Sequence, residues 1–180
     1  NILFLWKEKN EKVSHSKLLL KSSIFSNKDG VKQIIARLTK LGFDLEKIEF
    51  RGESVNYLAE YNEVDIALDT YPYVGGGTTC EALYMGTPVI TLVGDRPGAR
   101  FGYSILKNLG LDDCIAASKA EYIEKAVALA TNIARLTYLQ QQLRYMMEQS
   151  PLMNRKNYMK NIEAKYIDLY QENMKKLYSK

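Results

Sequence analysis

A glycine-rich segment between a predicted strand and a predicted helix carries the residues best suited to chemistry. The strand ends at Asp69, and ligands of open parallel sheets bind just beyond the carboxyl ends of strands. The loop contains Gly75–Gly77, whose backbone amides can approach a bound group closely. A helix then begins at Thr78 or Thr79, where unpaired amides, hydroxyls and the helix dipole favour an anion. These residue types predict a phosphate site.

The same residues also admit purely structural explanations. Gly75–Gly77 could form only a tight turn, and Thr78 to Glu81 fits a capping box with Thr78 as N-cap and Glu81 at the third helical position. The residues alone leave these alternatives open. A dinucleotide-binding fingerprint fits less well, because the pattern G-x-G-x-x-G is missing after the first strand. No Gly-Lys-Ser/Thr follows the glycines, so the segment is not a Walker loop.

Strands and helices alternate along the first two thirds of the chain, which positions this segment. The expected helices are Leu3–Lys12, Lys28–Leu41, Ser54–Glu63, Thr78–Met85 and Arg100–Asn108, and the expected strands are Lys17–Lys21, Lys47–Phe50, Asp65–Leu68, Pro88–Leu92 and Cys114–Ala116. This order predicts the α/β class, a Rossmann-like open parallel sheet flanked by helices. We expect one domain over residues 1–180, with the alternating core at 1–118 and C-terminal helices at 119–180, interrupted at Ser150-Pro151.

Composition narrows the classes of protein. The 180 residues are 46% apolar and 26% charged, as in one globular domain with a proper core. No apolar run approaches the ~20 residues that span a bilayer. The net charge is +4, but the lysines and arginines are scattered among acidic residues, which argues against nucleic-acid binding. The chain begins at Asn1 rather than Met, which suggests an excised domain.

The cysteines and the single histidine offer little chemistry. Cys80 and Cys114 lack metal-binding spacing, so no metal is expected. Together with the absence of a signal peptide, they indicate free thiols and a cytoplasmic protein. His15 lies in a polar turn before a strand, and we expect a solvated loop residue rather than a catalytic one.

Three ordered pieces of the chain match a known family. They are Leu-Asp-Thr-Tyr-Pro-Tyr, Gly-Thr-Thr-Cys-Glu-Ala-Leu-Tyr-Met-Gly and Pro-Val-Ile-Thr-Leu, all between Asp65 and Leu92. This segment resembles the donor-binding segment of the O-GlcNAc transferases, especially the bacterial and Spindly-type members. The likeness continues to the final helix around Tyr166 and covers nearly the whole chain. It implies the GT-B architecture, in which two Rossmann-like domains face across a cleft, and this chain resembles the second.

The resemblance also implies a donor and a set of contacts. The expected donor substrate is a UDP-sugar, UDP-GlcNAc above all, and no separate cofactor or metal is expected. Gly76, Gly77, Thr78 and Thr79 would hold the diphosphate. Glu81 would accept hydrogen bonds from the ribose hydroxyls.

Three further residues are candidates around this core. Tyr57 stands where the family often has a base-contacting histidine, so its ring could stack on uracil or merely pack against neighbouring apolar residues. Lys21, at the end of the first strand, could neutralise phosphate or be a solvated lysine. Arg100 matches a family arginine near the sugar, or is a surface arginine at a helix start.

The acceptor side of such a reaction is expected elsewhere. The resemblance places the active-site histidines in an N-terminal Rossmann-like domain, and a diphosphate-contacting lysine upstream of the first helix. We therefore expect this chain to bind UDP weakly and to transfer nothing alone. Expected partners are that missing domain, tetratricopeptide repeats where the parent protein has them, and a protein acceptor modified on Ser/Thr. A non-protein acceptor and a non-catalytic binding module with a structural glycine loop are the alternatives.

The last predicted helix carries an apolar stripe formed by Met159, Ile162, Tyr166 and Leu169. Such a stripe could be exposed and pair with itself in a homodimer. The alternative is that it packs wholly on its own domain.

Overall fold

The computed structural model describes residues 2–13 and 15–178, in which short strands pair in parallel. Strand β1 (Leu18–Lys21) pairs with β2 (Ile48–Arg51), and β4 (Val89–Leu92) lies between β3 (Ala67–Leu68) and β5 (Ile115–Ala116). The strands thus form a two-stranded and a three-stranded sheet, and in the described chain no backbone hydrogen bond joins β1 to β3. The predicted parallel α/β class is confirmed.

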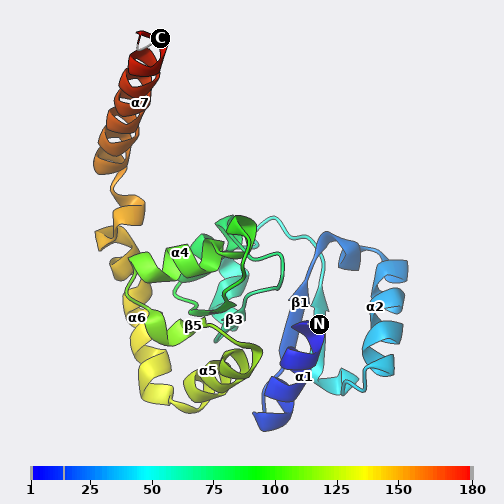
Figure 1. The fold of residues 1–180 in the computed structure, drawn as a ribbon. Coiled ribbons are helices and arrows are strands. Elements are labelled where there is room, and N and C mark those ends of the chain that lie inside the picture. Colours follow the sequence, from blue (N-terminus) through cyan, green and yellow to red (C-terminus); the bar gives the residue numbers. More distant parts are fainter. Residues whose placement is uncertain (1, 14, 179–180) are drawn as a thin grey trace.

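Helices cover both sheets (Figure 1). They are α1 (Ile2–Lys12), α2 (Lys28–Lys40), α3 (Gly77–Tyr84), α4 (Phe101–Asn108), α5 (Lys119–Thr131), α6 (Ile133–Gln149) and α7 (Arg155–Tyr178). Helix α2 flanks the two-stranded sheet, while α4, α5 and α6 surround the three-stranded one. Helix α1 packs against α5, which places the first helix of the chain beside the sheet that carries the glycine loop.

The core is centred on β4, whose four residues are all buried. Parallel strands covered on both faces are continuous apolar runs, which explains the sequence Val-Ile-Thr-Leu there. Leu83 of α3, Leu106 of α4 and Leu139 of α6 are fully buried in the same cluster. The glycine-loop segment is therefore attached at both ends to the best-packed part of the molecule.

The prediction of a helix over Ser54–Glu63 is wrong. The structure has turns at 55–58 and then a short 3₁₀ helix over Ala59–Glu63. An isolated helix of this length needs an apolar face packed against the protein, and Val55 is fully exposed at 104%. In addition, the Thr87 hydroxyl donates to the backbone carbonyls of Tyr61 and Val64, so these carbonyls accept hydrogen bonds from a residue outside the segment.

The C-terminal helix extends the predicted stretch of 157–176 by about half a turn at each end. Figure 1 shows α7 projecting away from the body, and none of its described residues is buried. Met159, Tyr166 and Leu169 are half or more exposed. The alternative that this apolar stripe packs wholly on its own domain is wrong.

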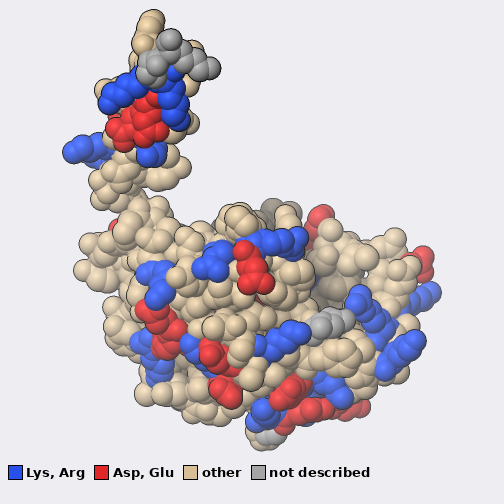
Figure 2. Space-filling model, in the orientation of Figure 1, with Lys and Arg blue, Asp and Glu red and all other residues tan. Residues whose placement is uncertain are grey.

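Charge is mixed over the face seen in Figure 2, where lysines and arginines alternate with acids over the body and over α7. In the described part of the chain, no helix is long and apolar enough to cross a membrane.

Candidate functional site

Asp69 fixes the glycine loop to the ends of two strands. It follows β3, is only 7% exposed, and accepts the Gly75 N–H at 2.7 Å through Oδ1. Its Oδ2 accepts the hydroxyl of Thr91 in β4, also at 2.7 Å. Burial raises the pKa of Asp69, while the hydrogen bonds from Gly75 and Thr91 oppose that rise. Asp69 therefore organises the loop, and Gly75 belongs to the loop's internal structure.

The three glycines have different surroundings. A Cβ on Gly75 would lie 2.6 Å from Thr78 Oγ1 and 2.7 Å from Thr79 Oγ1, so any larger residue would force these side chains to shift. A Cβ on Gly76 would meet Phe101 at 3.8 Å, an ordinary contact. A Cβ on Gly77 would meet nothing within 4 Å. The loop is tight at its first glycine and open at its last, where a ligand has room to approach the backbone.

The amino end of α3 presents unpaired backbone amides to this open side. The first α3 amide with a helical partner is that of Cys80, which donates to the Gly76 carbonyl. The amides of Gly77, Thr78 and Thr79 therefore lack intrahelical acceptors. A cavity of about 180 Å³ lies beside them, lined by Asp69, Thr70, Gly75, Thr78 and Thr79 among others. The free amides of this helix start are suited to an anion, and the carboxylate of Asp69 in the same lining is occupied by the Gly75 N–H and the Thr91 hydroxyl.

The capping-box explanation of this helix start is wrong. Gly76, not Thr78, is the N-cap, and no side chain caps the helix. The Glu81 side chain accepts the Tyr57 hydroxyl at 3.0 Å instead of reaching back to a backbone amide. Thr78 is exposed and Thr79 is buried at 3%, so the exposed Thr78 hydroxyl is the one open to solvent.

Tyr57 and Glu81, 24 residues apart in sequence, meet at the site. The ring of Tyr57 is 41% exposed, and Tyr61 from the same segment donates its hydroxyl to the Thr78 carbonyl at 3.4 Å. The bond to Glu81 raises the pKa of Tyr57, because the neighbouring carboxylate disfavours a phenolate. The structure thus brings Tyr57, Thr78 and Glu81 together, as the sequence-based hypothesis requires of a nucleoside pocket.

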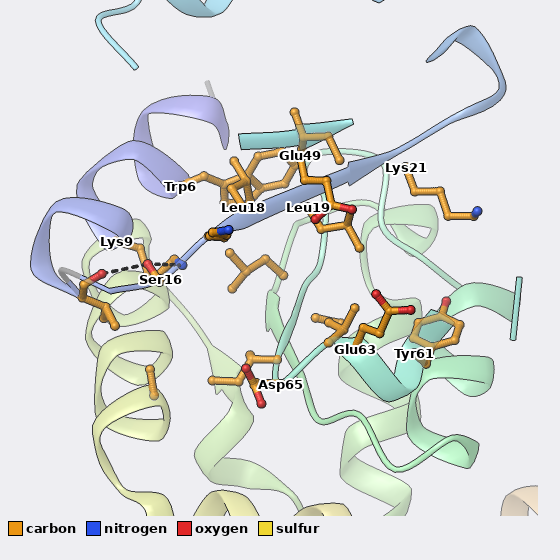
Figure 3. A pocket seen from close by; sticks show the side chains of 18 of the residues that line it. Trp6, Lys9, Ser16, Leu18, Leu19, Lys21, Glu49, Tyr61, Glu63 and Asp65 are labelled. Carbon is orange, nitrogen blue, oxygen red and sulfur yellow. Dashed lines mark hydrogen bonds between the residues drawn. The ribbon is translucent and has the colours of Figure 1, made fainter. Parts of the chain in front are cut away.

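Lys21 is exposed at the end of β1, and its ammonium group is paired with Glu60. Its Nζ lies 2.9 Å from both carboxylate oxygens of Glu60, 3.1 Å from Ser54 Oγ and 3.0 Å from the Gly52 carbonyl. Figure 3 shows Lys21 at the end of β1, with Tyr61 and Glu63 below it across a larger pocket. A direct contact of Lys21 with phosphate stays a prediction.

Arg100 is held at the start of α4. Its Nη1 donates to the Gly94 carbonyl at 3.1 Å, and its guanidinium stacks over Tyr103 at 4.7 Å. It is partly buried in the loop after β4 rather than free on the surface. Its contact with a sugar stays a prediction.

Sequence reasoning missed three residues that support Asp69. A Cβ on Gly102 would lie 2.6 Å from Asp69 Oδ2, so this glycine lets α4 approach the site. The buried Tyr122 donates its hydroxyl to the Asp69 carbonyl at 2.9 Å and accepts the Trp6 indole N–H at 3.1 Å. Of the three, only Gly102 had a local sequence signal, because a glycine in the first turn of a predicted helix is unusual.

His15 is exposed in a turn, as expected, and Cys80 and Cys114 are free thiols. Among the residues that the structure describes, no three His, Cys, Asp or Glu side chains gather in a way that could hold a metal ion.

Comparison with known proteins decides the family. The model of Glycosyl transferase family 41 matches residues 1–162. The chain belongs to glycosyl transferase family 41. Among family members, the probable UDP-N-acetylglucosamine–peptide N-acetylglucosaminyltransferase SPINDLY of Solanum lycopersicum is 33% identical over 172 residues, covering 94% of this chain and 18% of that protein. SPINDLY of Arabidopsis thaliana is 31% identical over 174 residues, covering 95% and 19%.

A solved family structure agrees with the fold. A mutant of the Thermobaculum terrenum O-GlcNAc transferase superposes with a TM-score of 0.88 at 28% identity, over 95% of this chain and 33% of that one. The chain thus spans less than a fifth of the length of these SPINDLY relatives and a third of the solved transferase.

Proposed function

We propose that this chain is the UDP-sugar-binding half of a glycosyltransferase that moves N-acetylglucosamine from UDP-GlcNAc to Ser/Thr of a protein acceptor. The observation that supports it best is the open amino end of α3, where unpaired amides, a glycine loop and a cavity coincide. SPINDLY relatives carry the name of peptide N-acetylglucosaminyltransferases, which supports the same donor and acceptor here.

Each part of UDP has a counterpart at the site. The diphosphate would accept from the amides of Gly77, Thr78 and Thr79 and from the exposed Thr78 hydroxyl. Glu81 would accept the ribose hydroxyls, which then replace its present donor Tyr57. The Tyr57 ring, released from that bond, would stack on uracil.

Transfer needs more than a donor site. The leaving UDP must be stabilised and the acceptor hydroxyl must be positioned. The amides of α3 supply part of the first task, and we propose that a separate N-terminal Rossmann-like domain supplies the second. Tetratricopeptide repeats, a cytoplasmic location consistent with the free thiols of Cys80 and Cys114, and a homodimer through α7 belong to the same proposal.

Calorimetric titration of the chain with UDP tests the proposal. Saturable binding that a Thr78→Ala/Glu81→Ala variant loses would place the donor at α3. A matched control is Thr131→Ala/Glu124→Ala, which changes the same residue types at exposed positions of α5 and should bind as the wild type does. No binding at millimolar UDP, or equal binding by the site variant, would favour a structural loop.

A further inference from the structure

The segment between β2 and β3, residues 52–64, bridges the two sheets of the molecule. On one side it contacts the ends of β1 and β2, and on the other it contacts α3 and the turn before β4. It also carries Tyr57, the aromatic candidate for the nucleoside. What fixes this segment therefore fixes the nucleoside end of the candidate site.

Toward β1, the segment is held by a partly exposed ion pair between Lys21 and Glu60. Glu60 places both carboxylate oxygens 2.9 Å from Lys21 Nζ, and the Ser54 hydroxyl donates to the same carboxylate. The two side chains are only 31% and 20% exposed, so water screens them less than a surface pair. Hydrogen bonds from Ser54 and Lys21 lower the pKa of Glu60, which keeps it ionised.

Arg51 at the end of β2 adds a second attachment. Its Nη2 lies 2.6 Å from Glu63, and its Nη1 lies 3.6 Å from the same Glu60 carboxylate. Glu60 and Glu63 of the segment are thus paired with cations at the ends of both strands. Glu60 is shared between them and is the centre of the attachment.

Toward α3, the segment is held by hydroxyl hydrogen bonds. Tyr57 donates to Glu81 at 3.0 Å, Tyr61 donates to the Thr78 carbonyl at 3.4 Å, and Thr87 donates to the Tyr61 carbonyl at 3.1 Å. A ribose on Glu81 would displace the first of these bonds. The ion pair with Lys21 would then be needed most, since it does not involve the ligand.

No strand ladder joins β1 to β3 in the described chain. A pocket of about 770 Å³, which Figure 3 shows, lies between β1 and the chain leading into β3, and no backbone hydrogen bond joins the two strands in the described chain. The start of the segment continues from β2, which pairs with β1, whereas the rest of it is held against β1 by side chains.

We infer that Lys21 and Glu60 are positioning residues for the nucleoside, and that Lys21 acts through Glu60 rather than on the diphosphate. The pair holds residues 52–64 so that the Tyr57 ring stays beside Glu81. This inference rests on the proposed UDP site, and it divides that site into two parts. The diphosphate part at α3 is independent of the pair, and the nucleoside part depends on it.

The test uses Lys21→Met, Glu60→Gln and the charge-reversed double variant Lys21→Glu/Glu60→Lys, titrated with UDP and with pyrophosphate. Each single variant should bind UDP about fivefold more weakly, the upper end for a partly exposed ion pair. Both should bind pyrophosphate as the wild type does, and the double variant should recover UDP affinity. The control is Lys12→Met/Glu8→Gln, which removes an exposed ion pair in α1 and should change neither affinity.

A ligand-free readout separates this inference from the proposed function. The ring signals of Tyr57 in NMR, assigned with Tyr57→Phe, should shift in both single variants and return in the double variant. Unchanged Tyr57 signals in the single variants would overturn the positioning role, whether or not the wild type binds UDP. A wild type that binds no UDP would overturn only the proposed function. Loss of pyrophosphate binding in Lys21→Met with unchanged UDP binding in Glu60→Gln would instead make Lys21 a direct phosphate contact.

Discussion

The Asp69 carboxylate accepts the Gly75 N–H at 2.7 Å, and this bond ties the glycine loop to the end of β3. Because the other oxygen holds Thr91, replacing Asp69 with Ala leaves two donors unpaired in a buried place. We expect Asp69→Ala to lower the free energy of unfolding by about 2 kcal/mol in urea denaturation. Asp69→Asn should cost less, and Asp65→Ala, at an exposed position, should cost almost nothing. Equal stability of Asp69→Ala and wild type would contradict this role.

The glycines at the two ends of the loop should respond oppositely to alanine. Gly75→Ala forces a Cβ within 2.7 Å of two threonine hydroxyls, so we expect a loss of about 1–3 kcal/mol of stability. Gly77→Ala meets no atom within 4 Å and lies in the first turn of α3, so stability should be kept or slightly raised. The methyl group that Gly77→Ala adds should nevertheless weaken UDP binding, measured by calorimetry, because it occupies the space beside the free amides. Wild-type UDP affinity in Gly77→Ala would place the diphosphate elsewhere.

The hydrogen bond between Tyr57 and Glu81 should be visible in a pH titration. It raises the pKa of Tyr57 above the ordinary value of about 10. The stabilisation is therefore fully present below the unfolded-state pKa and is lost as pH rises through the folded-state pKa. Absorbance at the phenolate band, taken as the difference between wild type and Tyr57→Phe, should show this raised pKa. In Glu81→Gln it should fall back toward the ordinary value, whereas the exposed Tyr145→Phe should not alter the Tyr57 titration.

The two thiols should differ in reactivity. Burial raises the pKa of Cys114 to about 12, so almost no thiolate is present near neutral pH. We expect Cys114 to resist a disulfide reagent in the native chain and to react once urea unfolds it. Cys80 is only partly buried and should react first, though slowly, since burial also raises its pKa. Mass spectrometry of the labelled peptides identifies which cysteine reacted, and native labelling of Cys114 at the unfolded rate would contradict its burial.

Helix α7 should be dispensable for folding. None of its described residues is buried, so a chain ending at Asn154 should keep its unfolding free energy within about 0.5 kcal/mol. If the exposed stripe forms the proposed homodimer, sedimentation should show a dimer for the whole chain and a monomer after truncation. A Tyr166→Glu variant, which places a charge in the stripe, should also be monomeric. A monomeric wild type would remove the homodimer from the proposal.

Local patterns carried most of the prediction. Four of the five expected helices before residue 109 and all the expected strands are found within a few residues of their expected bounds, because each is an apolar run or a 3.6-residue repeat with clear ends. The glycine-loop segment could also be predicted, since its glycines, threonines and helix start follow one another in the sequence. The helix expected at Ser54–Glu63 is absent because the segment has no continuous buried face: Tyr61 packs against the core, but Val55, Tyr57 and Leu58 are exposed.

The α/β class, the family likeness and the candidate anion site at the amino end of α3 follow from the residues and their order alone. Which side chains complete the candidate site depends on how distant elements pack. Tyr57 meets Glu81 across 24 residues and Lys21 meets Glu60 across 39. Local periodicity fixes backbone dihedrals over a few residues, whereas such pairs depend on how separate elements pack. The partners of Tyr57 and Lys21 therefore cannot be read from nearby residues, because the contacts form only after the long intervening chain has folded back.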